Sequence, residues 1–397
     1  MNGAIQKTPL YDWHVSHQAK MENFGGFLMP MWYASAKSEH LAVLTHAGLF
    51  DTSHMDTLTV RGRQAHDLLQ HCFTKDLDRC QGPKQSPLST GRCVYGAFLD
   101  EQGHAVDDAI VYKMAEAEYM VVVNAGMGSV ICGHLEAHRG AMAAEVTNLS
   151  GRLGKIDLQG PMAVRILQQA LAEPDQGEGT AALLSRTGYT GEIGFEFFCP
   201  TDRTASLWQA LLEAGQSLGV VPCGLAARDS LRAGAVLPLS HQDIGHWPFI
   251  NHPWPFALPY TPDGAGFTKD FIGARALLEA KDAMYTCAFA GFDPRKIPPG
   301  ETSVLDDRGQ EIGTILTCAT DMGIGRHEDV IYSIASPDRP AGFKPAGLSC
   351  GFVKVSCRLS PGERIKIKDK RRAIEVEAVT DIRPARTARQ PLKNFLG

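Results

Sequence analysis

The hydrophobic positions between residues 56 and 146 follow two different spacings. Alternation of apolar and polar side chains predicts strands at residues 57–60, 93–99, 105–112 and 119–123. Residues 64–73 and 128–138 instead repeat apolar side chains at helical spacing, which predicts two amphipathic helices. Strands and helices in this order are typical of an α+β unit in which two helices cover one sheet.

Similar elements are predicted on both sides of this unit. Residues 38–48 place their apolar side chains on one face of a helix. Residues 155–161 are predicted to be a strand that ends at Gly-Pro, and a helix is expected to follow at 162–172. Further along, Asp202 is expected to cap one helix, and residues 223–232 are expected to begin another.

The C-terminal part of the chain changes character from Tyr285 onward. Short apolar runs alternate there with Pro/Gly turns, which is typical of an all-β domain. Residues 364–377 are predicted to form a hairpin in which apolar side chains alternate with Lys on one strand and with Glu on the other. Residues 354–393 carry a modest basic excess, so a nucleic-acid arm is the alternative, but the alternation favours a solvated sheet face.

The composition is that of an ordinary soluble globular protein. The chain has 397 residues, of which 44% are hydrophobic and 21% are charged, and its formal net charge is −5. This length suggests two or three domains, and this charge gives no general attraction to nucleic acid. No apolar run approaches the roughly 20 residues that cross a bilayer, and the N-terminus does not resemble a signal peptide. We therefore expect a cytoplasmic protein that does not enter membranes.

The cysteines and histidines do not predict a metal site. No C-x-x-C pair occurs among the ten cysteines, so they are expected to be reduced thiols in a cytosolic protein. His241, His246 and His252 lie close together in the sequence, but their spacing matches no zinc pattern. His54 is a candidate general base without an identifiable partner, and a lone His is more often a packed, hydrogen-bonded residue.

The segment from Arg186 to Glu196 is the first candidate for chemistry. Three glycines are interleaved there with Tyr189, Glu192 and Glu196, and glycine lets a ligand approach the backbone closely. A strand is predicted to follow, in which Glu196 faces away from its phenylalanine neighbours. A carboxylate in this position can accept two parallel hydrogen bonds from a flat N–H edge. The alternative is a tight turn followed by a strand with one solvated Glu.

The second candidate is the acidic pair Asp107-Asp108 within a predicted strand. Adjacent residues of a strand face opposite sides of the sheet, so one of these carboxylates faces the apolar side or a cavity beside it. A buried carboxylate needs a donor or a ligand, which makes that Asp a candidate acid, base or cation stabiliser. The alternative is a strand that begins after Asp108, with both acids solvated. Arg228, near the start of a predicted helix, opposes the helix dipole and needs an acid or an anion nearby.

Taken together, six stretches of the chain resemble the aminomethyltransferase (T-protein) family of the glycine cleavage system, and the likeness covers most of the chain. They are Phe24-Gly25-Gly26, Phe50 to Met55, Val106-Asp107-Asp108, Leu158 to Pro161, Arg186 to Glu196 and Gly224 to Arg232. Each stretch is weak alone, but the six occur in the family's order. The resemblance implies an α+β fold, a three-domain cloverleaf with two N-terminal α+β domains and a C-terminal antiparallel β-barrel. The implied domains are residues 1–55 with 147–280 (folate-binding, discontinuous), 56–146 (ferredoxin-like) and 284–397 (barrel).

The resemblance also implies a reaction and a set of site residues. In this family an aminomethyl group carried on the lipoyl arm of H-protein loses ammonia, and its carbon passes to tetrahydrofolate to give methylenetetrahydrofolate. Asp107 would be the catalytic acid beside the folate amines, and Glu196 would hold the pterin edge. The other residues implied at the cofactor are Met55, Tyr189, Arg228 and Arg386.

Departures from the family pattern leave the one-carbon donor open. They lie at Leu231 to Gly234, at 239–242 and at 256–260, with smaller changes after Asn124 and at 384–387. One alternative is a tetrahydrofolate-dependent demethylase that takes a small N-, O- or S-methyl donor. Aromatic residues of the loop 240–260 would then enclose the donor. A non-catalytic folate-binding protein is the third alternative, but Arg186 to Glu192 lacks the Cys of that group's motif.

Overall fold

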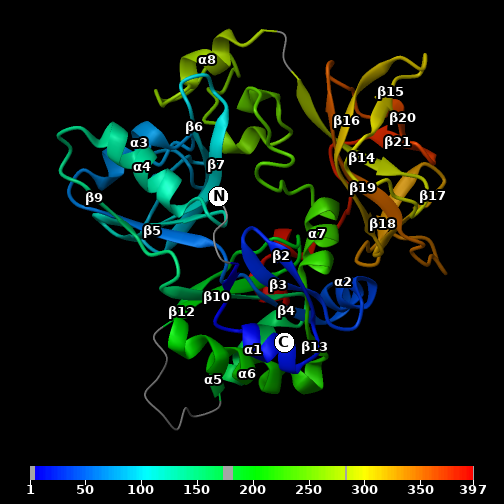
Figure 1. Cartoon of the computed structure of the whole chain (residues 1–397), viewed down its shortest axis with the longest axis horizontal. Coiled ribbons are helices and arrows are strands. Elements are labelled where there is room, and N and C mark those ends of the chain that lie inside the picture. Colours follow the sequence, from blue (N-terminus) through cyan, green and yellow to red (C-terminus); the bar gives the residue numbers. More distant parts are fainter. Residues whose placement is uncertain (1–4, 173–181, 282–283, 397) are drawn as a thin grey trace.

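The computed structural model describes residues 5–172, 182–281 and 284–396. Figure 1 shows three lobes arranged around a central region, with the two halves of the first lobe coming from distant parts of the chain. Two lobes combine helices with sheets, and the third contains a closed six-stranded β-barrel. The predicted α+β fold with a C-terminal barrel is therefore confirmed.

The first lobe is built on a five-stranded sheet in the order β11-β12-β10-β4-β13. Its strands are β4 (Ala47–Asp51), β10 (Leu153–Gln159), β11 (Leu183–Ser185), β12 (Gly194–Pro200) and β13 (Val220–Pro222). The same lobe contains helices α1 (Tyr11–Ser16), α2 (Ala36–Thr45), α5 (Ala163–Ala172) and α6 (Thr204–Gly215). The expected cap at Asp202 is wrong, because Asp202 lies inside a short 3-10 turn and α6 begins after it without a side-chain cap.

A small sheet in the order β1-β3-β2 adds to this lobe, with β1 at Gln6–Lys7, β2 at Lys20–Phe24 and β3 at Phe27–Trp32. Apolar side chains of α1, β4, β10, β12, α5 and α6 form one core, in which Trp208 is fully buried. Burial of a large side chain of this kind contributes about 1.5–3 kcal/mol to folding. The core therefore anchors β10 and β12, the strands that carry Lys155, Asp157 and Glu196.

The second lobe has the strand order β6-β7-β8-β5-β9. Its elements are β5 (Asp56–Arg61), α3 (Ala65–Cys72), β6 (Arg92–Leu99), β7 (Ala105–Ala115), β8 (Glu118–Val123), α4 (Gly128–Arg139) and β9 (Glu145–Asn148). Apart from the edge strand β6, this is the β-α-β-β-α-β arrangement of ferredoxin-like units. Each of the strands and helices predicted between residues 57 and 138 is present.

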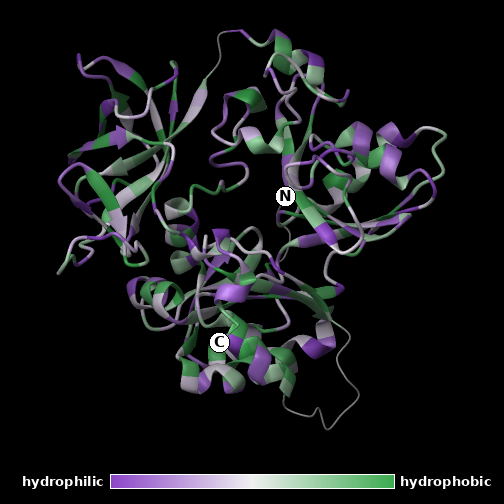
Figure 2. Cartoon of the chain, turned by 180° about the vertical axis from the view of Figure 1, so that it is seen from behind, coloured by the Kyte–Doolittle hydropathy of each residue, from purple (hydrophilic) through white to green (hydrophobic). Residues whose placement is uncertain are grey.

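The third lobe is the barrel β14-β19-β16-β15-β20-β21. Its strands are β14 (Tyr285–Gly291), β15 (Ser303–Leu305), β16 (Glu311–Asp321), β19 (Leu348–Val355), β20 (Arg364–Lys368) and β21 (Ala373–Ala378), and β17 (Ile324–His327) pairs separately with β18 (Val330–Ser333). In the predicted hairpin, Ile365 and Ile367 are buried while their Lys neighbours are exposed. The hairpin prediction is confirmed, and the alternating colours of the barrel strands in Figure 2 follow from this inward and outward alternation.

Helix α7 (Leu225–Gly234) lies where the three lobes meet (Figure 1). Arg232, on this helix, is fully buried and pairs with Asp243 and, at 2.8 Å, with Asp229. Its Nη2 also donates to Thr317 Oγ1 of the barrel at 2.9 Å. Buried charges are stable only when paired, so this network places α7 and the barrel in a defined relation.

The remaining elements are short. They are α8 (Ala274–Glu279) and the 3-10 turns Thr201–Arg203, Gln216–Leu218, Phe249–Asn251, Pro255–Ala257, Thr387–Arg389 and Leu392–Asn394. Two of these turns lie in the segment 240–260, which is otherwise irregular, as expected. Among the described helices, none is long and apolar enough to cross a bilayer.

Candidate functional site

A cavity of about 1810 Å³ lies between the three lobes. Its wall includes Met55, Glu196 and Arg228 from the first lobe, Asp108 from the second, and Lys296 and Arg358 from the third. A cavity that is mostly apolar with a few charged groups is the usual form of a site for a cofactor or small substrate, and this one is larger than a single small ligand needs. The six residues come from distant parts of the sequence, so the site forms only when the lobes are assembled.

Glu196 occupies the cavity wall as an ion-paired residue rather than as a solvated one. Its Oε1 lies 2.5 Å from Lys155 Nζ, and its Oε2 accepts from Thr187 Oγ1 and from Tyr112 Oη at 3.3 Å. Glu196 and Lys155 are both almost completely buried. The alternative of a solvated Glu is therefore wrong. One oxygen of Glu196 already accepts two hydrogen bonds. Glu196 could therefore accept two parallel hydrogen bonds from a flat ligand edge only if Thr187 or Tyr112 moved.

Lys155 extends this pair into a network with Asp157 and Arg228. Lys155 Nζ lies 2.6 Å from Asp157 Oδ1, and Arg228 Nη1 lies 2.6 Å from Asp157 Oδ2. Burial alone would raise the pKa of Asp157, but the two cations outweigh burial and hold that pKa well below its usual range. Asp157 is thus the acid that Arg228 was expected to need. The charges of the two cations and the two carboxylates cancel, so this network gives the cavity wall little net charge.

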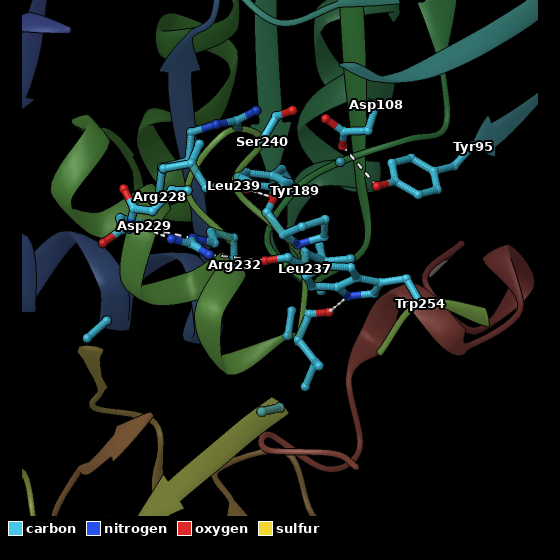
Figure 3. Close-up of a pocket in the computed structure, with 18 of the residues that line it drawn as sticks. Tyr95, Asp108, Tyr189, Arg228, Asp229, Arg232, Leu237, Leu239, Ser240 and Trp254 are labelled. Atoms are coloured by element: carbon cyan, nitrogen blue, oxygen red, sulfur yellow. Dashed lines mark hydrogen bonds and ion pairs between the residues drawn. The ribbon is translucent and has the colours of Figure 1, made fainter. Parts of the chain in front are cut away.

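The two acids of β7 face different surroundings, as their alternation predicts. Asp108 lies on the cavity wall, whereas Asp107 is fully buried behind it. Figure 3 shows Asp108 and Tyr95 pointing toward each other from neighbouring strands, and the tyrosine hydroxyl donates to Asp108 Oδ2 at 2.9 Å. Burial, followed by the adjacent Asp107 carboxylate, raises the pKa of Asp108 above its usual range. A carboxyl group with this pKa can hold or release a proton near neutral pH.

Asp107 is held by donors from two lobes. Its Oδ1 accepts from Asn124 Nδ2 and from Ser240 Oγ, both at 2.8 Å, and its Oδ2 accepts from the Asn124 backbone N–H at 3.0 Å. Asn124 Nδ2 also donates to Asp108 Oδ1 at 2.8 Å, so a single amide bridges the two carboxylates. This arrangement fixes the acid pair in one geometry.

His241 brings a cation to the same acid pair. Its Nε2 lies 3.4 Å from Asp107 Oδ1, and 53% of its side chain is exposed. The hydrogen bond to Asp107 raises the pKa of His241, which favours the imidazolium form. Sequence reasoning considered His241 only as a metal ligand and missed this pairing, because nothing in the chain pattern links it to Asp107.

The other expected residues also reach the cavity wall. Tyr189 donates its hydroxyl to the Pro238 carbonyl oxygen, and the Arg228 guanidinium lies 4.9 Å from the centre of its ring. Arg386 donates to the Ala235 carbonyl oxygen and pairs with Asp381 at 2.8 Å. Met55, Tyr189 and Arg386 all line the cavity. Asp108 lines it too, whereas Asp107 lies behind the wall.

Comparisons with known proteins agree with this arrangement. The family described as the GCVT N-terminal domain matches residues 10–247. A curated aminomethyltransferase from Halalkalibacterium halodurans is 40% identical over 332 residues, which cover 79% of this chain and 86% of that protein. The chain belongs to the aminomethyltransferase family. The resemblance of the six sequence stretches is therefore confirmed at the level of the family.

Other family members extend the likeness over nearly the whole chain. The aminomethyltransferase of Anoxybacillus flavithermus is 40% identical over 252 residues, covering 60% of this chain and 67% of that protein. The crystal structure of glycine cleavage system aminomethyltransferase T from Bartonella henselae superposes with a TM-score of 0.73 at 27% identity. That match covers 94% of this chain and 97% of the other, so the barrel belongs to the shared fold.

The aromatic residues of the loop 240–260 divide into packed and accessible groups. Phe249 and Trp254 belong to the hydrophobic core between the lobes, and Trp247 is also buried. Trp254 additionally lines the cavity and donates its Nε1–H to the Val236 carbonyl oxygen at 2.9 Å (Figure 3). Phe256, in contrast, is 52% exposed on the cavity wall, where its ring lies 5.7 Å from that of Tyr95. Phe256 is thus the aromatic side chain of this loop that is freest to contact a substrate.

His54 lies on the cavity wall in its neutral form. Burial is the largest effect on its pKa, which falls to about 4, and Nδ1 of this ring has no hydrogen-bond partner among the described residues. A base with this pKa is largely unprotonated at neutral pH but weakly basic, so His54 is better suited to donating or accepting a hydrogen bond than to removing protons. This nitrogen is buried, so a ligand in the cavity could reach it only after a side-chain movement.

The buried neutral His54 should weaken the fold at acid pH. Its pKa in the folded chain, about 4, is below the unfolded value of about 6.5, so its contribution is complete above pH 6.5 and is lost as pH falls. We expect this residue alone to lower the free energy of unfolding by about 2 kcal/mol between pH 7 and pH 5. Urea unfolding at both pH values should show a correspondingly smaller loss in His54→Gln; the same loss in both proteins would exclude this assignment.

Gly191 allows the Arg186–Glu196 segment to pass close to the end of α7 and to the segment that follows the barrel. Its φ is +78°, and an added Cβ would lie 2.8 Å from both Ala235 Cβ and Arg386 Cδ. Gly191→Ala should therefore destabilise the fold by about 2–4 kcal/mol, combining left-handed strain with overpacking. Gly264→Ala is the control, because its φ is +70° but an added Cβ would meet no described atom within 4 Å. Equal losses of unfolding free energy in the two variants would contradict the close approach.

Proposed function

We propose that this chain transfers a one-carbon unit to tetrahydrofolate bound in the central cavity, with an aminomethyl group on a lipoylated H-protein as the donor. Membership of the aminomethyltransferase family supports the reaction class. The observation that carries the proposal is the acid pair of β7, in which Asp108 faces the cavity and Asp107 is held behind it by Asn124 and Ser240. A carboxylate held rigidly beside a cavity can stabilise positive charge that develops on a reacting amine.

The cavity wall fits the chemistry of tetrahydrofolate. Asp108 and Glu196 offer carboxylate oxygens to the N–H groups of a pterin. Lys296 and Arg358 of the barrel lie on the wall and are exposed, so they suit the carboxylates at the other end of the molecule. Tetrahydrofolate supplies the amine nitrogens that accept the one-carbon unit.

In this proposal Asp107 and Asp108 have different roles. Asp108 contacts the reacting nitrogen, and its raised pKa lets it hold or accept a proton there. Asp107 positions Asn124, Ser240 and His241 around the pair. His241, exposed to the cavity and favoured as imidazolium, is placed to give a proton to the leaving group of the donor. Asp107, the catalytic acid expected from the resemblance, is thus proposed as a positioning residue.

A small methylated donor is the second candidate, and the aromatic wall favours it. Phe256, Tyr95 and Tyr260 line the cavity, Tyr95 contacts Asp108, and aromatic faces can hold a methylated cation by cation–π contact. The two candidates differ in their products. An aminomethyl donor releases one ammonia for each carbon transferred, whereas a substituted methyl donor leaves its demethylated amine, alcohol or thiol. Measuring ammonia together with the folate product therefore separates them.

Binding of tetrahydrofolate tests the proposal before any donor is known. Glu196→Gln removes a charge at the pterin end and should weaken tetrahydrofolate binding by about 1–3 kcal/mol, the range for hydrogen bonds to charged groups. Glu213→Gln is the matched control, because Glu213 is exposed on α6. This variant should bind tetrahydrofolate as tightly as the unchanged protein. Isothermal titration calorimetry on the folded proteins makes the comparison. Equal affinities in all three proteins would remove Glu196 from the site.

A further inference from the structure

A second cluster of ligand-type side chains lies in the second lobe, between helices α3 and α4. Cys72 ends α3, and His134 and His138 lie four residues apart on α4, so the two imidazoles share one face of that helix. One donor atom from each of the three residues lies within 4.8 Å of the others. Figure 1 shows the two helices side by side on the outer face of the lobe sheet. The site is separate from the residues that line the central cavity.

Within the described part of the chain, the hydrogen bonds of the cluster leave one ring nitrogen of each histidine without a partner that would block metal binding. His138 Nδ1 lies 2.8 Å from the His134 carbonyl oxygen, so Nδ1 carries the proton and Nε2 keeps its lone pair. An imidazole whose Nδ1–H donates to a backbone carbonyl is the usual arrangement of a metal-bound His. His134 Nε2 is buried and has no hydrogen-bond partner among the described residues. A buried nitrogen without a partner is costly, and a metal ion would satisfy it.

We propose that Cys72, His134 and His138 bind a Zn²⁺ ion. One thiolate and two imidazoles are ligands that Zn²⁺ accepts in tetrahedral sites. Ligand atoms around tetrahedral zinc are about 3.5 Å apart, so the observed spacing needs only small side-chain adjustments. On binding, the Cys72 thiol loses its proton to solvent and the sulfur becomes a thiolate ligand.

A small cavity of about 260 Å³ reaches the site from solvent. It is lined by His71 and His138 together with Glu101 and Asp270. The His71 ring lies 6.1 Å from that of His138, so His71 or a water molecule can fill the fourth position. The two carboxylates, Glu101 and Asp270, outnumber the single cation Arg275 in this lining, so the cavity is weakly favourable to a divalent cation. Cys72 is far in sequence from His134 and His138, so the spacing of ligand residues along the chain did not predict this site.

Cobalt substitution of the full-length protein tests the proposal. The protein is treated with a chelator, dialysed and titrated with Co²⁺, whose bond to a thiolate produces a charge-transfer absorption band in the near ultraviolet. We expect one equivalent to bind with this band, and Zn²⁺ to displace it. Cys72→Ser should abolish the band, and His138→Gln should weaken Co²⁺ binding at least about tenfold.

Matched variants separate this site from other cysteines and histidines. Cys132→Ser on α4 and His66→Asn on α3 lie outside the cluster and should keep the band and the affinity. His246→Asn removes a member of the other group of possible ligands, Asp100, His104 and His246, and should also have no effect. No Co²⁺ binding to the folded protein, or an unchanged band in Cys72→Ser, would overturn the proposal. If Cys72→Ser does not fold, unchanged affinity in the half-buried His138→Gln would overturn it equally.

Discussion

Asp108→Asn should slow one-carbon transfer by about 100-fold while the protein remains folded. The change keeps the shape of the side chain but removes the charge that faces the cavity. Asn can still accept from Asn124 Nδ2, and the Tyr95 hydroxyl can turn to accept from the new amide, so both contacts of Asp108 can be kept. Steady-state rates with tetrahydrofolate, together with thermal unfolding curves, give the measurement.

The pH dependence gives the same prediction a second readout. Activity that needs the Asp108 carboxylate should fall as pH drops through its raised pKa, and this fall should begin at a higher pH than for an ordinary Asp. The pH profile of the Asp108→Asn variant should lack this fall of activity at low pH. Asp107→Asn is the comparison, since it should act indirectly, by loosening Ser240 and His241. If Asp107→Asn abolished turnover and Asp108→Asn did not, the reacting group would be the buried Asp107.

Arg383→Met should lower the free energy of unfolding by about 3–5 kcal/mol, the cost of breaking a buried ion pair. Arg383 is 1% exposed, and its Nη1 lies 2.5 Å from Asp321 Oδ2 in the barrel. Its Nε lies 3.3 Å from Glu192 Oε1 in the glycine-rich segment. His40 Nε2 of α2 meets the other oxygen of Asp321 at 2.9 Å. Loss of Arg383 would leave two buried carboxylates without this cation at the junction of two lobes.

An exposed arginine in the same segment provides the control for Arg383. Arg389 pairs with Asp381 at 2.9 Å, but 63% of its side chain is exposed, so Arg389→Met should cost less than about 1 kcal/mol. Denaturant unfolding at neutral pH measures both variants. A loss for Arg383→Met as small as that for Arg389→Met would contradict the claim that this cluster holds the lobes together.

The elements of the fold were largely predictable because each depends on local spacing. The strands and helices of the second lobe and the hairpin at β20 and β21 bury the apolar positions that the sequence pattern marks. The start of α6 was missed, because Asp202 has the side chain of a cap but lies within a 3-10 turn. A side-chain type alone does not fix where a helix begins.

The candidate site was only partly predictable, because its contacts join distant segments. Strand alternation showed that Asp107 and Asp108 face opposite sides, but not which side holds the cavity. The register of β6 and β7 shifts between Phe98 and Leu99, beside Asp107, so the cavity face cannot be counted from the strand ends. No pattern in the sequence predicts the ion-pair partners of Lys155 and Arg383. Their pairs appear only when the lobes assemble.

The most direct test of the account is a product balance with the purified protein, tetrahydrofolate and H-protein carrying an aminomethyl group on its lipoyl arm. We predict that ammonia and the one-carbon derivative of tetrahydrofolate appear in equal amounts and that both are lost when any component is omitted. Formation of the folate derivative without ammonia, from a methylated small molecule only, would replace the H-protein donor with the second candidate. No folate product from the folded protein with either donor class would contradict one-carbon transfer in this cavity.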